Sequence, residues 1–151
     1  MRLTRTTTML LASLMLTMMA SGRTSHSTLP VLPNPVLYLT GTEAFVQGGR
    51  NYVRYNYDVF NKDAYPPELF APAPELPPCG LNKNSSRTWV DIFDQRGKRL
   101  YGFCALGKPD NLRGIWFALE EDVVPPSWIY IEMNDRQTST KYKSNLAETV
   151  L

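Results

Sequence analysis

The alternation of apolar and polar residues along the chain predicts β-strands. The clearest case is 52–60 (YVRYNYDVF), where apolar residues at every second position alternate with Arg54, Asn56 and Asp58. Because successive side chains of a strand point to opposite faces, this pattern is typical of a half-buried antiparallel strand. Other segments rich in β-forming residues bring the predicted strands to seven, at 36–46, 52–60, 89–94, 99–106, 114–119, 128–134 and 141–150.

The joins between these segments are rich in Gly, Pro and Asn, and no amphipathic helix separates the strands. Parallel strands need long crossover connections, which are usually helical, so an antiparallel arrangement is expected. The turn at Gln47-Gly48-Gly49 and the hairpin around 95–98 fit this arrangement. The expected fold class is therefore all-β, a seven-stranded antiparallel two-sheet sandwich, with a small β-barrel as the competing architecture.

A long Pro-rich stretch at 61–88 interrupts the strand pattern. Six of the twelve Pro lie between Pro66 and Pro78, which excludes a helix interior or a central strand there. Long loops in compact domains are often functional, so this loop is a candidate contact surface. Its aromatic residues, Tyr65 and Phe70, are assigned to a possible binding surface, although with Leu69 they could instead anchor the loop by packing.

The N-terminus has the three parts of a secretory signal peptide in order. Arg2 and Arg5 precede an uncharged, mostly apolar run of 12 residues at 9–20, and small residues follow it to Gly22. The run is short of the roughly 20 apolar residues of a membrane span, so no membrane insertion of the mature chain is expected. The predicted organisation is a signal peptide at 1–22, a linker at 23–35 and a β-sandwich domain at 36–151, with a buried N-terminal helix or a retained anchor as alternatives. A secreted or periplasmic location follows.

Composition adds little beyond this organisation. A chain of 151 residues with 43% hydrophobic and 20% charged residues suits one globular domain. The net charge of +2 is carried by the two Arg of segment 1–22, which holds no acidic residue, so the mature chain is neutral. No nucleic-acid partner is expected, because such proteins normally carry a dense basic patch.

The two cysteines gain meaning from the predicted export. Cys79 ends the Pro-rich loop and Cys104 lies on a predicted strand, and disulfides form in oxidising compartments. We expect a Cys79–Cys104 disulfide that pins the loop to the sheet and stabilises the fold by about 3 kcal/mol. Two buried free thiols are the alternative, and the spacing is not the Cys-x-x-Cys of thioredoxin-like proteins.

No set of catalytic residues stands out. The one His, His26, falls in the predicted linker, and no Gly-x-Ser-x-Gly or phosphate-binding Gly-rich motif is present. The acidic run 120–122 leaves a carboxylate-based polysaccharide hydrolase open, although a solvated loop is the simpler interpretation. We therefore expect no enzyme, no cofactor and no metal site.

The predicted strand 128–134 has two distinct faces. Ile129, Ile131 and Met133 share one face, whereas Trp128 and Tyr130 share the other. If the aliphatic face points inward, Trp128 and Tyr130 form an outer patch, and exposed apolar patches indicate interfaces. These two residues are therefore assigned to the possible binding surface, with core or cross-strand packing as the alternative.

Residues 127–150 resemble the last two strands of fibronectin type III domains. In that family an aromatic-led strand ends near Asn and is followed by a turn and a last strand containing Ser-Asn, as at Trp128, Tyr130, Asn134, Ser144 and Asn145. The segment 89–93 fits a middle strand of that family, whereas the 61–88 insertion departs from it. A transthyretin-like sandwich ranks second, and Gly102 stands two residues before Cys104 where antibody domains carry Tyr. The resemblance implies an immunoglobulin-like fold and no particular activity.

The function expected from the sequence is an exported, non-enzymatic binding or structural module. Its ligand would be a protein or a glycan, and its oligomeric state stays open. A secreted inhibitor that presents the disulfide-tethered Pro-rich loop is the first alternative, and the hydrolase is the second. Asn84-Ser85-Ser86 is an N-glycosylation acceptor if the source is eukaryotic.

Overall fold

The structure is a computed structural model that describes residues 31–79, 85–107 and 112–150. The chain divides between Pro30 and Val31, and all described residues belong to the second unit. The predicted signal peptide at 1–22, together with His26, lies outside the described residues. Within the described ranges, no helix is long and apolar enough to cross a membrane.

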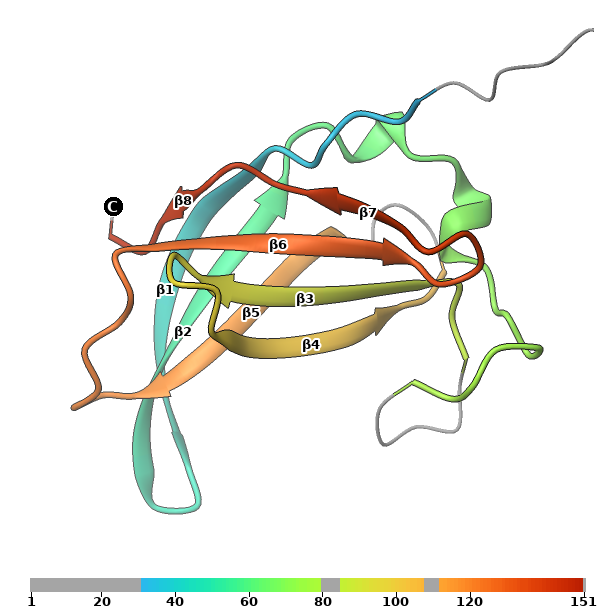
Figure 1. Cartoon of the computed structure of the whole chain (residues 1–151). Coiled ribbons are helices and arrows are strands. Elements are labelled where there is room, and N and C mark those ends of the chain that lie inside the picture. Colours follow the sequence, from blue (N-terminus) through green and yellow to red (C-terminus); the bar gives the residue numbers. More distant parts are fainter. Residues whose placement is uncertain (1–30, 80–84, 108–111, 151) are drawn as a thin grey trace, which may run out of the picture. The chain divides into compact units, whose positions relative to one another are not determined.

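The described chain folds into two antiparallel β-sheets (Figure 1). One sheet has three strands in the order β1-β2-β5, and the other has the order β4-β3-β6-β7, with β8 also paired to β6. The predicted all-β, two-sheet antiparallel architecture is confirmed. The strands are β1 (Leu37–Gln47), β2 (Arg50–Val59), β3 (Thr88–Asp94), β4 (Arg99–Ala105), β5 (Arg113–Glu120), β6 (Trp128–Asp135), β7 (Thr140–Lys143) and β8 (Ala147–Glu148).

The predicted last strand at 141–150 differs from the structure, which has the short strands β7 and β8 in its place. Between them, Ser144 Oγ accepts a hydrogen bond from the Ile131 N–H at 2.9 Å. The side chain of Asn145 bonds both the N–H and the C=O of Leu37 on β1, at 2.7 and 3.0 Å. At Ser144 the side-chain bond accompanies a backbone bond from the Ser144 N–H to the Ile131 carbonyl at 2.9 Å, and Asn145 ties the last segment to the opposite sheet.

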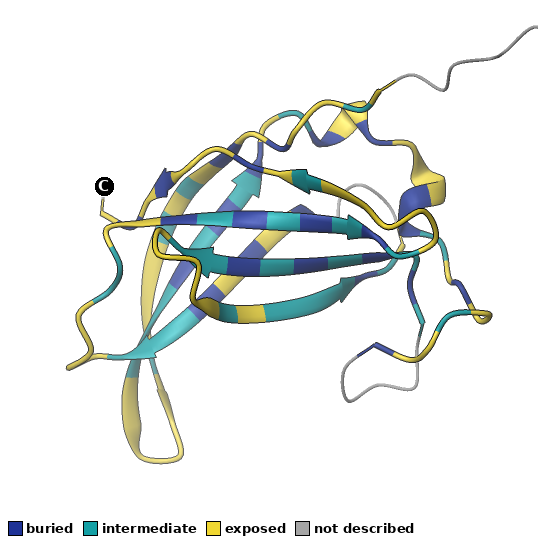
Figure 2. Cartoon of the chain, in the orientation of Figure 1, coloured by how far each residue is buried: buried dark blue, intermediate teal, exposed yellow. Residues whose placement is uncertain are grey.

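The core lies between the inward faces of the two sheets (Figure 2). The alternation on β2 places Tyr55, Tyr57 and Val59 inside, as the sequence predicts. Removing these apolar faces from water is the main favourable contribution to folding. Other buried side chains of the core, contributed by β3, β5 and β6, are Val90, Ile92, Ile115, Phe117, Ile129, Ile131 and Met133.

The β1–β2 hairpin turns at Gly48-Gly49, where φ is 57° and 78°. Two successive residues in the left-handed region match a two-residue hairpin loop, and Gly adopts this conformation without strain. The predicted turn is therefore present. The exposed end of the hairpin extends beyond the rest of its sheet (Figures 1 and 2).

The Pro-rich stretch contains two 3₁₀ turns, η1 (Lys62–Ala64) and η2 (Pro67–Phe70). The Tyr65 hydroxyl donates to the Pro33 carbonyl at 2.7 Å. Leu32 packs against the core, and residues 31–35 belong to the folded unit, although their polar and Pro-punctuated sequence predicts a linker there.

Candidate functional site

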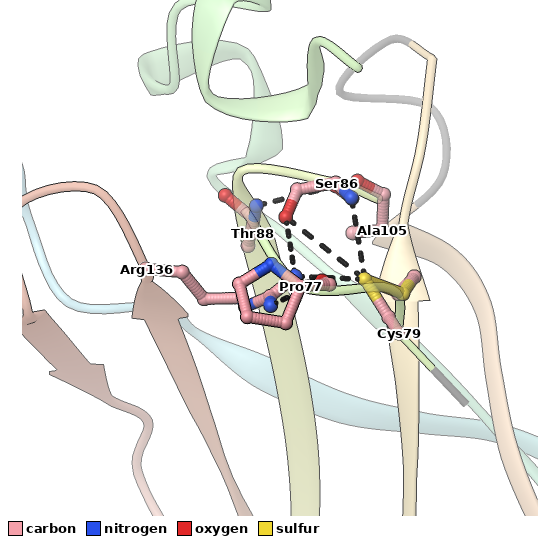
Figure 3. The surroundings of a disulfide bond; sticks show 7 residues. Pro77, Cys79, Ser86, Thr88, Ala105 and Arg136 are labelled. Carbon is pink, nitrogen blue, oxygen red and sulfur yellow. Dashed lines mark hydrogen bonds between the residues drawn. A yellow bond between two sulfur atoms is a disulfide. The ribbon is translucent and has the colours of Figure 1, made fainter. Parts of the chain in front are cut away.

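The predicted Cys79–Cys104 disulfide is present, with a Cα–Cα distance of 5.8 Å. It joins the end of the Pro-rich loop to β4 (Figure 3). Because the loop contributes Cys79 and the sheet contributes Cys104, the bond fixes the loop against one edge of the five-stranded sheet.

Arg136, directly after β6, reaches into this junction (Figure 3). Its Nη1 donates to Cys79 Sγ and to the Ser86 carbonyl, each at 3.0 Å, and its Nη2 donates to the Pro77 carbonyl at 2.6 Å. The Ser86 N–H also donates to Cys79 Sγ, at 3.2 Å. One guanidinium group therefore holds both arms of the loop and contacts one sulfur of the disulfide.

Two buried hydroxyl groups complete the junction. Ser86 and Thr88 have no exposed surface. The Ser86 hydroxyl donates to the Ala105 carbonyl on β4 and accepts from the Thr88 N–H at 3.2 Å. The Thr88 hydroxyl donates to the Leu69 carbonyl at 2.5 Å. Buried polar groups are tolerated when they are hydrogen-bonded, and these bonds connect the loop, β3 and β4.

Tyr65 and Phe70, assigned to a possible binding surface, are 2% and 0% exposed. They pack in the core cluster with Leu69, so the structure gives them the anchoring role and removes them from any exposed surface. The exposed residues of the loop include Pro74, Glu75, Pro77 and Pro78, just before Cys79. The sequence pattern could not separate the anchoring residues from the exposed ones, because residues of both kinds are apolar or flanked by Pro.

Trp128 and Tyr130 lie on the outer face of β6, because Ile129 and Ile131 are buried on its inner face. Tyr130 is nevertheless covered. Its ring stacks on Phe93 with centroids 5.2 Å apart, and the Lys143 ammonium lies 4.0 Å from the ring centroid. Tyr130 therefore offers no open ring face to a ligand.

Trp128, by contrast, is 40% exposed and lines a hollow of about 530 Å³ at one end of the sandwich. Val124 and Val150 in the same lining are 87% and 67% exposed. Soluble proteins seldom expose several large apolar side chains side by side, and such patches usually mark interaction sites. The lining residues are Val124, Pro125, Ser127, Trp128, Glu148, Thr149 and Val150.

A second aromatic group was not expected from the sequence. Arg54 on β2 lies between the rings of Phe45 and Trp116, at 5.1 and 4.7 Å from the ring centroids. Phe45 stacks on Tyr52, and Trp116 stacks on Tyr101 of β4. These stacked rings cover one another's faces and connect the two sheets. The alternation on β2 places Arg54 on the outer face of its sheet. The rings around it come from three other strands, β1, β4 and β5, so the sequence pattern could not predict this group.

Two residues of the acidic run 120–122, which begins at the last residue of β5, are engaged in local contacts. Arg50 pairs with Glu120 at 2.7 Å, and the Asn51 side-chain amide donates to Glu121 at 3.0 Å. These residues border a hollow of about 370 Å³ at the base of the hairpin. Among the described residues, no group of three or more His, Cys, Asp or Glu is placed to hold a metal ion. The acceptor Asn84 lies outside the described residues.

No protein-family model, no curated protein and no solved structure matches this chain. Its candidate site therefore rests on geometry and chemistry. The hollow beside Trp128 is the strongest candidate for a binding site, because it combines an exposed aromatic side chain with exposed apolar neighbours.

Proposed function

We propose that the protein is an exported, non-enzymatic binding module of the immunoglobulin and fibronectin type III kind, which captures a protein ligand at the hollow beside Trp128. The single observation that carries the proposal is the exposure of Trp128, Val124 and Val150 around one hollow. Partly exposed Trp side chains in apolar surroundings are typical of the residues that dominate protein interfaces.

The strand order supports the proposed fold type. When β1 to β7 are named A, B, C, C′, E, F and G in chain order, one sheet reads A-B-E and the other C′-C-F-G. Immunoglobulin-type sandwiches place A, B and E in one sheet and C, F and G in the other, and C′ joins the second sheet in the variable type. The fold type by itself implies no ligand, so the ligand is argued from the hollow.

The chemistry of the hollow favours a protein over a glycan. Its lining is mainly apolar, and the Thr149 hydroxyl, which could bind a sugar, already donates to the Pro126 carbonyl at 2.5 Å. An adjoining hollow of about 400 Å³ shares Val124 and Pro125 and adds Arg96 and Lys98. Asp94 also lines it, and its Oδ1 already accepts from the Arg96 and Lys98 backbone N–H groups, each at 2.8 Å. A protein segment with an apolar side chain flanked by carboxylates would match both hollows.

The backbone around the hollow is held in place before any ligand arrives. The Gln95 N–H donates to the Trp128 carbonyl at 3.0 Å, and the Thr149 N–H donates to the Ser127 carbonyl at 3.2 Å. The Val123 N–H closes a turn onto the Glu120 carbonyl at 2.9 Å. A surface that is already ordered loses less conformational entropy on binding, which favours affinity.

The ligand class can be tested by selection from a random peptide library displayed on phage, with a glycan array in parallel. The variant is Val124→Asp, and the matched control is Val46→Asp on the β1–β2 hairpin. Both positions are strongly exposed, at 87% and 69%, so neither change should disturb folding. We expect the wild type and Val46→Asp to enrich peptides with apolar and acidic residues, and Val124→Asp to lose them.

Two results would contradict this proposal. If Val124→Asp enriches the same peptides as the wild type, the ligand binds elsewhere. If no peptide is enriched, but the wild type binds glycans on the array and Trp128→Ala does not, the ligand is a glycan.

The proposed export has its own test. Secreted material should begin near residue 23 on N-terminal sequencing, whereas retention of Met1 would contradict a cleaved signal.

A secreted inhibitor is a second candidate, favoured by the way the exposed part of the Pro-rich loop is held. Leu76 N–H donates to the Ala73 carbonyl at 3.0 Å, Arg136 holds the Pro77 carbonyl, and Cys79 is tied to the sheet. A loop restrained at several points loses little entropy in an enzyme's cleft. Inhibition of a protease panel that disappears when 74–78 is replaced by Gly and Ser would support this function.

A further inference from the structure

The two sulfur atoms of the disulfide have different surroundings. Cys79 is 5% exposed, and its Sγ accepts hydrogen bonds from Arg136 Nη1 at 3.0 Å and from the Ser86 N–H at 3.2 Å. Cys104 is partly exposed and lies on β4, an edge strand of its sheet. The bond is therefore open to attack mainly at one sulfur and is surrounded by donors at the other.

We propose that Cys104 is a modification site for small aliphatic thiols. An incoming thiolate attacks Cys104 Sγ and forms a mixed disulfide there, while Cys79 leaves as a thiolate held by Arg136 and the Ser86 N–H. This directed exchange is independent of the ligand-binding role proposed above, because the disulfide and the Trp128 hollow share no residue.

The step is balanced without an outside oxidant. The attacking thiol first gives its proton to the buffer, and its sulfur then forms a new S–S bond with Cys104 Sγ. The Cys79–Cys104 bond breaks, and its electron pair passes to Cys79 Sγ. The incoming sulfur is oxidised and Cys79 is reduced, as in any thiol–disulfide exchange.

Charge decides which sulfur is the better leaving group. Exchange is faster when the departing thiolate is more stable, and a guanidinium beside a sulfur stabilises its thiolate. Burial of Cys79 works against a charged sulfur, but here the lost water is replaced by two N–H donors, one of them charged. The other acceptors of Arg136, the Pro77 and Ser86 carbonyls, are neutral, so they do not offset its charge.

Access supports the same direction. A thiolate must approach along the S–S axis from behind the sulfur that it attacks. At Cys79 that sulfur is enclosed by the loop and by Arg136, whereas β4 has a neighbouring strand on one side only. The stabilisation of the Cys79 thiolate by Arg136 and the more open approach to β4 therefore both favour attack at Cys104 Sγ.

The loop should stay in place after exchange. Arg136 continues to hold the Pro77 and Ser86 carbonyls, and the Ser86 and Thr88 hydroxyls keep their bonds to β4 and to the loop. We therefore expect modification of the native fold, with no requirement for unfolding.

The site can be identified by treating the folded wild type with reduced glutathione, quenching with acid, blocking free thiols and mapping the peptides. We expect glutathione on Cys104 at least about tenfold more often than on Cys79, with Cys79 recovered as the blocked free thiol. Glutathione on Cys79, equal amounts on both, or a mixed disulfide formed only in denaturant would each overturn the proposal.

The role of Arg136 is tested by the rate of exchange in Arg136→Gln and Arg136→Lys, with Arg50→Gln as a control for net charge at a distant, exposed site. We expect Arg136→Gln to slow exchange roughly tenfold, Arg136→Lys to retain most of the rate, and Arg50→Gln to match the wild type. Loosening of the loop alone would make exchange faster, so an unchanged or faster rate in Arg136→Gln would overturn this role. If Arg136→Gln does not fold, the wild-type mapping decides the proposal alone.

Discussion

Arg87 and Asp135 form a two-point ion pair, in which Arg87 Nε and Nη2 donate to the two Asp135 carboxylate oxygens at 2.9 and 2.7 Å. The pair joins the residue before β3 to the last residue of β6. Asp135 also accepts from the Gln137 N–H at 3.1 Å and from the Thr138 hydroxyl at 2.8 Å. Burial acts to raise the pKa of the Asp135 carboxyl, but these bonds and the charge of Arg87 outweigh it and hold the pKa below its ordinary value.

Asp135→Asn should lower the free energy of unfolding at pH 7 by about 2–3 kcal/mol, because it leaves a partly buried Arg87 without its anion. Urea or guanidinium denaturation measures the change. Glu132→Gln is the control, since Glu132 pairs with an exposed Lys141 at 3.7 Å and should lose under about 0.5 kcal/mol. Equal losses in the two variants would contradict a special contribution of the Arg87–Asp135 pair.

The same pair should give the fold an acid-sensitive component. Because the pKa of Asp135 is lower in the folded state than in the unfolded state, its stabilisation is complete above the unfolded pKa of about 3.9. It is lost as the pH falls through the folded pKa. The stability advantage of the wild type over Asp135→Asn should therefore shrink when unfolding is measured from pH 5 down to pH 2. An advantage that stays constant over this range would contradict the low pKa.

Two buried tyrosines should limit stability at alkaline pH. Burial raises the pKa of Tyr57 and Tyr65 well above the ordinary value, and their hydroxyls donate to the Glu148 and Pro33 carbonyls. The unfolded chain loses these protons first, near pH 10, so the free energy of unfolding should fall above that pH. Tyr57→Phe should make the decline from pH 9 to pH 11 shallower.

The matched control for this decline is Tyr38→Phe, because Tyr38 is 43% exposed. This variant should keep the wild-type slope of stability against pH. Absorbance at 295 nm should show late ionisation of the buried phenols, completed only on unfolding. A Tyr57→Phe slope equal to that of Tyr38→Phe would refute the assignment.

Replacing both cysteines with Ala should lower the free energy of unfolding by about 3 kcal/mol, because the unfolded chain is no longer restrained by a loop of this length. Amide exchange should rise at 74–79 and stay low on β6, since Arg136 and the hydroxyl bonds still hold the junction. Global loss of protection, with no folded baseline in denaturation, would mean that the disulfide is required for folding.

Gly102 on β4 faces Asp91 on β3, and a Cβ at this position would meet the Trp89 ring at 2.8 Å as well as the Arg99 guanidinium and the Asp91 carboxylate. Gly102→Ala should therefore cost about 1–3 kcal/mol of stability through overpacking. Adding Arg99→Ala should recover part of the loss, because one of the crowding groups is then gone. A neutral Gly102→Ala would show that the three side chains can move aside together.

The hollow beside Trp128 shows how far the pattern along the chain could lead toward a site. The alternation on 128–134 correctly separates the inner from the outer face, because the face of a strand residue depends only on its position. Whether an outer residue is open depends on its neighbours. Phe93 and Lys143 cover Tyr130 from two other strands, whereas Trp128 sits at the strand end next to exposed apolar side chains.

Local sequence patterns were enough to predict most of the strands, their inner faces, the Gly48-Gly49 turn and the disulfide. These features follow from local periodicity, from the conformations open to Gly, and from the presence of two cysteines with one possible pairing. Tertiary structure decided the burial of Tyr65 and Phe70, the break between β7 and β8, and the contact of Arg136 with Cys79. Each of these depends on partners distant in the chain, such as Leu37 for Asn145, and only the folded order of strands brings such partners together.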